Sequence, residues 1–147
     1  MWLFLVHHAD AVSPDVDPAR PLSASGHTQA QSVADRVAGR TAKPAAVWHS
    51  GKLRARQTAE IYWRRCNPIA TFTASRGLQP EDDPRTIRDA LVGEAEDLMI
   101  VGHYPHLPAL LQLLTGEGRA FPQHGAVALE RVDTTWVERW REAPFTT

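Results

Sequence analysis

Trp2-Leu3-Phe4-Leu5-Val6 runs directly into His7-His8 near the start of the chain. Five consecutive apolar residues are typical of a strand that is buried on both faces. In an open α/β sheet, the residues that follow such a strand lie at its carboxyl edge, where ligands usually bind. The stretch therefore predicts a buried strand that carries two imidazoles to a functional edge of the sheet.

The rest of the chain alternates short apolar runs with helical patterns. Strands are predicted near 2–7, 45–49, 69–73, 97–102, 126–132 and 135–140, and helices near 26–39, 53–65, 84–92 and 106–114. This alternation is typical of α/β proteins with a largely parallel sheet. We expect one domain over residues 1–147, an α/β three-layer sandwich in which helices flank a mostly parallel mixed sheet.

Two local features follow from the same patterns. Ser25 precedes the first apolar helix positions and is the predicted N-cap of that helix. Trp136, Glu138 and Trp140 alternate along the last predicted strand, so we expect them to share one face of the sheet.

Composition narrows the possible partners. Lys and Arg number 16 against 17 Asp and Glu, so the formal charge of -1 gives no global attraction for nucleic acid or an anionic membrane. The apolar start is far shorter than the ~20 residues of a membrane span. Cys66 is the single cysteine and cannot form an internal disulfide. These features predict a cytoplasmic protein without nucleic-acid or membrane partners.

Two further motifs also follow apolar runs. They are Ser50-Gly51-Lys52-Leu53-Arg54-Ala55-Arg56-Gln57-Thr58-Ala59 and Val101-Gly102-His103. Arg54 would stand at the start of a helix, where a guanidinium can bind two phosphate oxygens and the helix terminus adds partial positive charge. The three segments together predict an anion site that also holds imidazoles.

In their residues and order, these segments resemble the histidine phosphatase superfamily, which is phosphoglycerate mutase-like in fold. Its members carry Arg-His-Gly after the first strand, then Ser-x-x-x-Arg-Ala-x-Gln-Thr-Ala, and a second His late in the chain. The segment Arg20-Pro21-Leu22-Ser23 is similar to the Arg-Pro-Leu-Thr of the short bacterial phosphohistidine phosphatases, which the chain resembles most. The resemblance extends from Leu3 to about Val132.

The resemblance implies a phosphatase that acts through a phosphohistidine intermediate. His8 would be the nucleophile, because a neutral imidazole attacks phosphorus well near neutral pH. The implied catalytic residues are His8, His103 and Arg54, and the implied substrate-binding residues are Arg20, His7, Ser50 and Ser23. Neither a metal nor another cofactor is implied. The substrate would be a phosphorylated protein or a small phosphorylated molecule.

The chain departs from the family pattern at two positions. His7 stands where the family has an Arg that clamps phosphate, and Ala9 stands where it has Gly. An imidazole would need to be protonated to replace the guanidinium, so His7→Arg is expected to restore the clamp. Ala9 would be strained if this position needs a positive φ.

The general acid is left open by the sequence. Glu81, Asp82 and Asp83 form the acidic loop where larger members of the superfamily keep one. The short phosphohistidine phosphatases show no dedicated acid, and a phosphoramidate needs less acid catalysis than an alkyl phosphate. That comparison favours phosphohistidine as the substrate.

Two other functions fit the same residues. The first is a phosphate- or phosphoprotein-binding module in which the changes at His7 and Ala9 have abolished turnover. The second is a metal-dependent hydrolase whose imidazoles and carboxylate would suit zinc or manganese. Its ligands would come from His7, His8, Asp10, His49 and His103.

Overall fold

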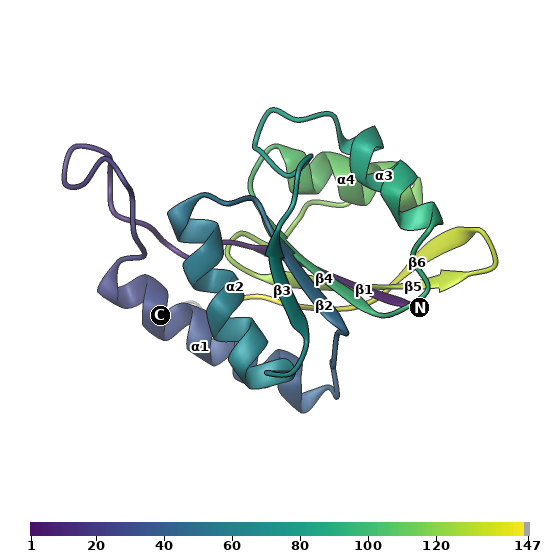
Figure 1. Ribbon diagram of the computed structural model, residues 1–147, viewed down its shortest axis with the longest axis horizontal. Helices are drawn as coiled ribbons and strands as arrows, with labels where there is room; N and C mark the ends of the chain where they lie inside the picture. The colour runs from purple at the N-terminus through teal and green to yellow at the C-terminus, as the bar shows by residue number, and fades with distance from the viewer. Residues whose placement is uncertain (146–147) are drawn as a thin grey trace.

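A computed structural model describes residues 1–145 of the chain (Figure 1). The strands are β1 (Trp2–His7), β2 (Ala46–His49), β3 (Thr71–Ala74), β4 (Leu98–Gly102), β5 (Ala126–Val132) and β6 (Thr135–Glu142). The helices are α1 (Ala24–Gly39), α2 (Leu53–Cys66), α3 (Pro84–Val92) and α4 (His106–Thr115). Each element lies within a few residues of its predicted place.

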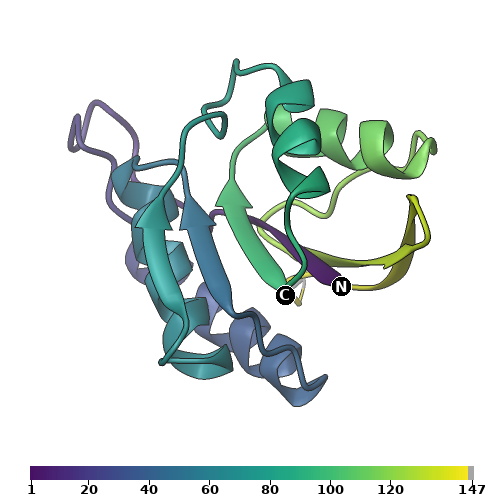
Figure 2. The same cartoon turned by 45° about the vertical axis from the view of Figure 1, so that its right-hand side comes forward.

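The strands form one six-stranded sheet in the order β3-β2-β4-β1-β5-β6. The pairs β3–β2, β2–β4 and β4–β1 are parallel, and β5 and β6 add two antiparallel pairs. Helices cover both faces, with α1 and α2 on one side and α3 and α4 on the other (Figures 1 and 2). The expected α/β sandwich with a mostly parallel mixed sheet is confirmed.

The first strand shows why an unbroken apolar run was needed. Because side chains alternate along a strand, Leu3 and Leu5 pack into the core under α3 and α4, whereas Phe4 and Val6 pack into the core under α1 and α2. All four side chains are buried. β1 therefore lies between two cores, and its carboxyl end is fixed between β4 and β5.

The first helix begins earlier than predicted. Its N-cap is Ser23, whose hydroxyl accepts a hydrogen bond of 3.0 Å from the Gly26 N–H. The hydroxyl of Ser25 lies 3.1 Å from that of Ser23 and does not cap the helix. The prediction of Ser25 as the cap was wrong, because both serines precede the apolar face and only the backbone conformation distinguishes them.

The last strand contains a β-bulge. Trp140 pairs with Ala128, but Glu138 pairs with the next residue, Leu129, so Arg139 is the extra residue. One extra residue reverses the alternation of side chains. Trp136 consequently packs in the core under α3 and α4, whereas Trp140 packs against the other core. The prediction that both tryptophans share a face was wrong.

Within residues 1–145, none of the helices combines the length and apolar character that crossing a bilayer requires.

Candidate active site

Three adjacent parallel strands bring the predicted residues together. In the sheet order β2-β4-β1, Ser50 follows β2, His103 follows β4 and His8 follows β1. The His8 N–H donates to the Gly102 carbonyl at 3.1 Å, and the rings of His8 and His103 lie 5.1 Å apart. The predicted residues thus meet at the carboxyl edge of the parallel strands, where ligands bind in open α/β sheets.

The His8 ring is oriented by its own backbone neighbour. Its Nδ1 lies 2.7 Å from the Ala9 carbonyl oxygen, which can only accept, so Nδ1 carries the proton and Nε2 carries a lone pair. Burial, followed by the positive charges of Arg54, His124 and Arg20, lowers the pKa of His8 to about 4, against the bond to Ala9. His8 is therefore a neutral imidazole with a free Nε2 at neutral pH.

Ala9 is accommodated without strain. Its backbone does not adopt a positive φ, and its buried methyl group packs against Leu22 and Ala30. The Ala9 N–H donates to the Thr58 hydroxyl at 3.0 Å, and that hydroxyl donates to the Arg54 carbonyl at 2.8 Å. The backbone strain that a positive φ would cause is therefore absent at Ala9. Thr58 links the loop that follows His8 to α2 through these two hydrogen bonds.

Arg54 lies in the first turn of α2. No side chain caps this helix, whose N-cap residue is Lys52. The Arg54 Nε is buried and has no hydrogen-bond partner among residues 1–145. Burial together with the charge of Arg20 lowers the pKa of its guanidinium. An unpaired guanidinium beside an uncapped helix N-terminus can bind an anion.

Ser50 and His103 form a pair. The Ser50 hydroxyl lies 2.6 Å from the His103 Nε2, and both residues are buried. Burial, then the charges of His8 and Arg54, lowers the pKa of His103 to about 3. Ser50 thus fixes the orientation of the His103 ring, and its predicted contact with substrate stays a prediction.

His7 is packed as an aromatic side chain. Its ring is sandwiched between Tyr104, with ring centroids 4.4 Å apart, and His124, at 4.9 Å. Its Nδ1 accepts a 2.8 Å hydrogen bond from the His124 backbone N–H, which leaves the ring proton on Nε2. Burial, then the charges of His8 and His124, lowers the pKa of His7 to about 2.

The structure therefore corrects the expected role of His7. A protonated imidazole would place an Nδ1–H against the His124 N–H, and burial opposes the charge as well. His7 is neutral at physiological pH and can offer only its Nε2–H to an anion. A cationic clamp at this position is ruled out by the contacts of the ring.

His124 was missed by the sequence reasoning. Its Nδ1 lies 2.8 Å from the His8 carbonyl oxygen, and its ring centroid lies 6.1 Å from that of His8. The loop residue comes just before β5, which runs antiparallel to β1. An antiparallel strand begins at the edge where its parallel neighbours end. The signal that could have found it was a histidine two residues before a predicted strand, had that strand been taken as antiparallel to β1.

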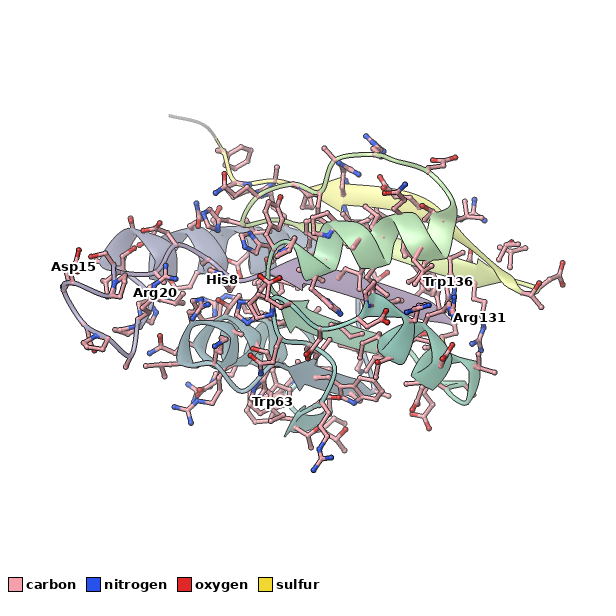
Figure 3. All side chains as sticks on the ribbon, turned by 90° about the horizontal axis from the view of Figure 1, so that it is seen from above. His8, Asp15, Arg20, Trp63, Arg131 and Trp136 are labelled. Carbon is pink, nitrogen blue, oxygen red and sulfur yellow. The ribbon has the colours of Figure 1, made fainter. Side chains whose placement is uncertain are left out.

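Arg20 and Ser23 come from the loop between β1 and α1. Figure 3 shows Arg20 between the loop tip at Asp15 and His8. The Arg20 Nε donates to the Val12 carbonyl at 3.0 Å, and its charge is among those that lower the pKa values of His8 and Arg54. Its predicted contact with substrate stays a prediction. The Ser23 hydroxyl, however, caps α1 and donates to Asp10 Oδ2 at 2.7 Å, so it is not free for the predicted substrate contact.

The acidic loop does not supply a carboxylate to His8. Asp83 caps α3 and pairs with Arg85 at 2.7 Å, which lowers the pKa of the Asp83 carboxyl to about 2. Asp82 accepts from the Gln79 N–H at 2.9 Å, and Glu81 is exposed. None of the main contributions to the pKa of His8 comes from a carboxylate. The sequence left the general acid open, and this loop does not place one at the nucleophile.

The five candidate ligands of a metal-dependent hydrolase do not come together in the structure. The His49 Nδ1 accepts from the Gly51 N–H at 3.0 Å, and the Asp10 carboxylate accepts from Ser23. Among the described residues, one ring nitrogen each from His7, His8 and His124 lies within 4.8 Å of the others. That spacing suits a metal ion, but the His7 Nδ1 lone pair is already engaged and Arg54 lies beside the group. The arrangement fits an anion better than a cation.

Comparison with known proteins finds one family model that matches part of the chain. Residues 9–79 match the model of the histidine phosphatase superfamily (branch 1). No curated protein matches the chain in sequence. The resemblance to this superfamily that the motifs predicted is confirmed, and the described motifs Ser50–Ala59 and Arg20–Ser23 lie inside the matched segment.

Solved structures share the fold over nearly the whole chain. The protein histidine phosphatase SixA, complexed with tungstate, is 24% identical with a TM-score of 0.87, covering 98% of this chain and 97% of its own. A putative phosphohistidine phosphatase SixA from Agrobacterium tumefaciens is 24% identical with a TM-score of 0.83, covering 97% of each chain. A mycobacterial glucosyl-3-phosphoglycerate phosphatase complexed with VO3 is 16% identical with a TM-score of 0.73, covering 97% and 99%. The phosphoglycerate mutase-like fold is thereby confirmed.

Proposed function

We propose that this protein is a phosphatase in which His8 is transiently phosphorylated. The observation that carries the proposal is the His8 ring itself. Its Nδ1–H is held by the Ala9 carbonyl, so the Nε2 lone pair is available, and its lowered pKa keeps the ring neutral. The unpaired Arg54 guanidinium lies close enough to perturb that pKa. A nucleophile and an anion-binding group therefore share one site.

The geometry supports a two-step reaction. In the first step, the His8 Nε2 attacks phosphorus and the bond to the leaving group breaks. Arg54, Arg20 and the N-terminus of α2 would hold the phosphoryl oxygens, and His103 would donate to them as negative charge develops. In the second step, water attacks phosphorus and the P–N bond breaks, which releases inorganic phosphate and restores His8.

We infer phosphohistidine on a protein as the favoured substrate, with a small phosphate ester as the alternative. A hollow of about 530 Å³ adjoins Ser50. Its lining includes Arg76, Asp82 and Asp83, and this mixture of charges suits a polypeptide segment. The solved SixA relative is a protein histidine phosphatase, which supports the same substrate class.

Rapid quench with a labelled phosphodonor tests the proposal. The expected result is an adduct that is acid-labile and base-stable, that maps to His8, and that is absent from a folded His8→Ala variant. His27→Ala is the matched control, because His27 is exposed on α1 and should retain both adduct and turnover. An adduct and turnover that survive in His8→Ala would refute the assignment. Phosphate binding without any adduct or turnover would support a binding module.

Arg54→Ala tests the anion-binding group. Loss of a charge-assisted contact of about 1.5–3 kcal/mol predicts a fall in kcat/KM of about 10- to 100-fold. Arg56→Ala is the control, because Arg56 is exposed and lies two residues further along the same helix. Chelator should leave the wild-type rate unchanged. Activity that is lost in chelator and restored by zinc or manganese would favour the metal-dependent hydrolase.

A further inference from the structure

His124 is held at the nucleophile by contacts that fix its ring. Its Nδ1 bonds to the His8 carbonyl oxygen at 2.8 Å, its backbone N–H donates to the His7 Nδ1, and its ring stacks on that of His7 with an interplanar angle of 7°. Its φ of 57° lies in the left-handed region, which non-glycine residues adopt only when their surroundings hold them there. These contacts together hold the His124 ring in one orientation beside His8.

The hydrogen bonds decide which nitrogen is free. The His8 carbonyl oxygen can only accept, so the His124 Nδ1 carries a proton in both charge states of the ring. The Nε2 then either carries a second proton or has a lone pair. His124 can therefore give or take one proton at Nε2 without losing its bond to the backbone.

The two rings lie close enough to flank one phosphoryl group, with their centroids 6.1 Å apart. One ring nitrogen each from His8 and His124 lies within 4.8 Å of the other. A phosphorus atom held on the side of the His8 ring that faces His124 would lie between the rings. An oxygen on that phosphorus can then come within the reach of about 2.6–3.2 Å that proton transfer requires.

No carboxylate competes for this role among the groups that most affect His8. Those groups are Arg54, His124 and Arg20, and the acidic loop is engaged with Arg85 and with its own backbone. The charged and titratable groups at the site are therefore imidazoles, guanidiniums, the Lys52 ammonium and the Tyr104 phenol. Only an imidazole among them can transfer a proton near neutral pH.

We propose that His124 is the general acid and base of the phosphatase reaction. The inference rests on the proposed function. In the first step the His8 Nε2 attacks phosphorus, the bond to the leaving oxygen or nitrogen breaks, and that atom takes the proton from the His124 Nε2. In the second step the neutral His124 Nε2 takes a proton from water, the resulting hydroxide bonds to phosphorus, and the P–N bond to His8 breaks. The net reaction consumes one water and leaves both rings as they began.

His124→Asn isolates this function. Asparagine tolerates a positive φ, and its amide N–H can replace the Nδ1–H that donates to the His8 carbonyl. It offers no titratable group in place of Nε2. The substitution therefore removes the proton transfer while it retains the backbone conformation and the supporting bond.

The measurement compares two substrates with different leaving groups. Phosphoserine has an alkoxide leaving group that needs a proton, whereas the nitrophenolate of p-nitrophenyl phosphate leaves without one. His124→Asn should lower kcat/KM for phosphoserine by about 10²- to 10⁴-fold, the usual worth of general acid catalysis. For p-nitrophenyl phosphate the loss should stay below about 10-fold. Because the second step also loses its base, a burst of one nitrophenolate per protein should appear.

The outcomes separate the possible explanations. Equal losses on both substrates without a burst would overturn the proposal and leave His124 as a positioning residue. Stoichiometric zinc that is required for activity and lost in His124→Asn would overturn it in favour of a metal ligand. A wild-type protein that forms no His8 adduct would refute the phosphatase itself, which is a distinct result. His27→Asn should behave as the wild type on both substrates.

Discussion

Replacing His7 with arginine should lower the stability of the folded protein. It should not restore the phosphate contact that the family's arginine makes at this position. The ring lies between Tyr104 and His124 with only 5% of its surface exposed, and its Nδ1 is the acceptor for the His124 N–H. Arginine has no acceptor and is larger. The substitution therefore leaves an N–H unpaired and overfills a packed space.

The magnitude follows from these two losses. The unpaired N–H costs about 1 kcal/mol, the low end of the usual range because His124 is half-buried, and overpacking costs about 1–3 kcal/mol. The free energy of unfolding should fall by about 2–4 kcal/mol. Since 1 kcal/mol corresponds to about 2–4 °C in a chain of this size, Tm should fall by about 4–16 °C.

Chemical and thermal denaturation followed by circular dichroism measure the change. His7→Asn retains an acceptor near the His124 N–H and should lose less stability than His7→Arg. His27→Arg adds the same side chain at an exposed position and should stay within about 0.5 kcal/mol of the wild type. A His7→Arg variant as stable as the wild type, or with a higher kcat/KM, would refute this reasoning.

Three further expectations follow from the structure. Ser23→Ala removes the cap of α1 and should cost about 1 kcal/mol in urea denaturation, whereas Ser25→Ala should cost little. Gly26→Ala would place a Cβ 2.0 Å from the Asp10 carbonyl oxygen and should lower Tm clearly; Gly39→Ala, with open space around it, should not. An NMR titration should place the midpoint of His8 near pH 4. Because the unfolded chain binds that proton near pH 6.5 and the folded chain does not, stability should fall as pH drops through this window, and a midpoint near 6.5 would contradict the assigned burial.

The sequence determined the architecture and identified the residues that the fold brings together at the candidate site. The apolar run of β1, the alternation of strand and helix patterns, and the spacing of His8, Arg54 and His103 were sufficient for this. The hydrophobic period can be read from neighbouring residues, and it indicates which side chains are buried. Residues that follow parallel strands then meet at one edge of the sheet, whatever the details of the fold.

The tertiary structure alone decided how individual polar atoms are used. Ser23 and Ser25 are equivalent in the sequence, and the backbone conformation made Ser23 the cap. The bulge at Arg139 separated two tryptophans that regular alternation would place together. Both outcomes depend on a single residue of register, which periodicity does not resolve.

The roles of His7 and His124 were also decided only by tertiary contacts. These residues are separated by more than 100 positions in the chain. Even so, the His7 Nδ1 accepts a hydrogen bond from the His124 backbone N–H, and the two rings stack. A histidine alone in the sequence can be a cation, a donor or a base. Its tautomer and charge are set by what each ring nitrogen bonds to and by how far the ring is buried, and the folded chain fixes both.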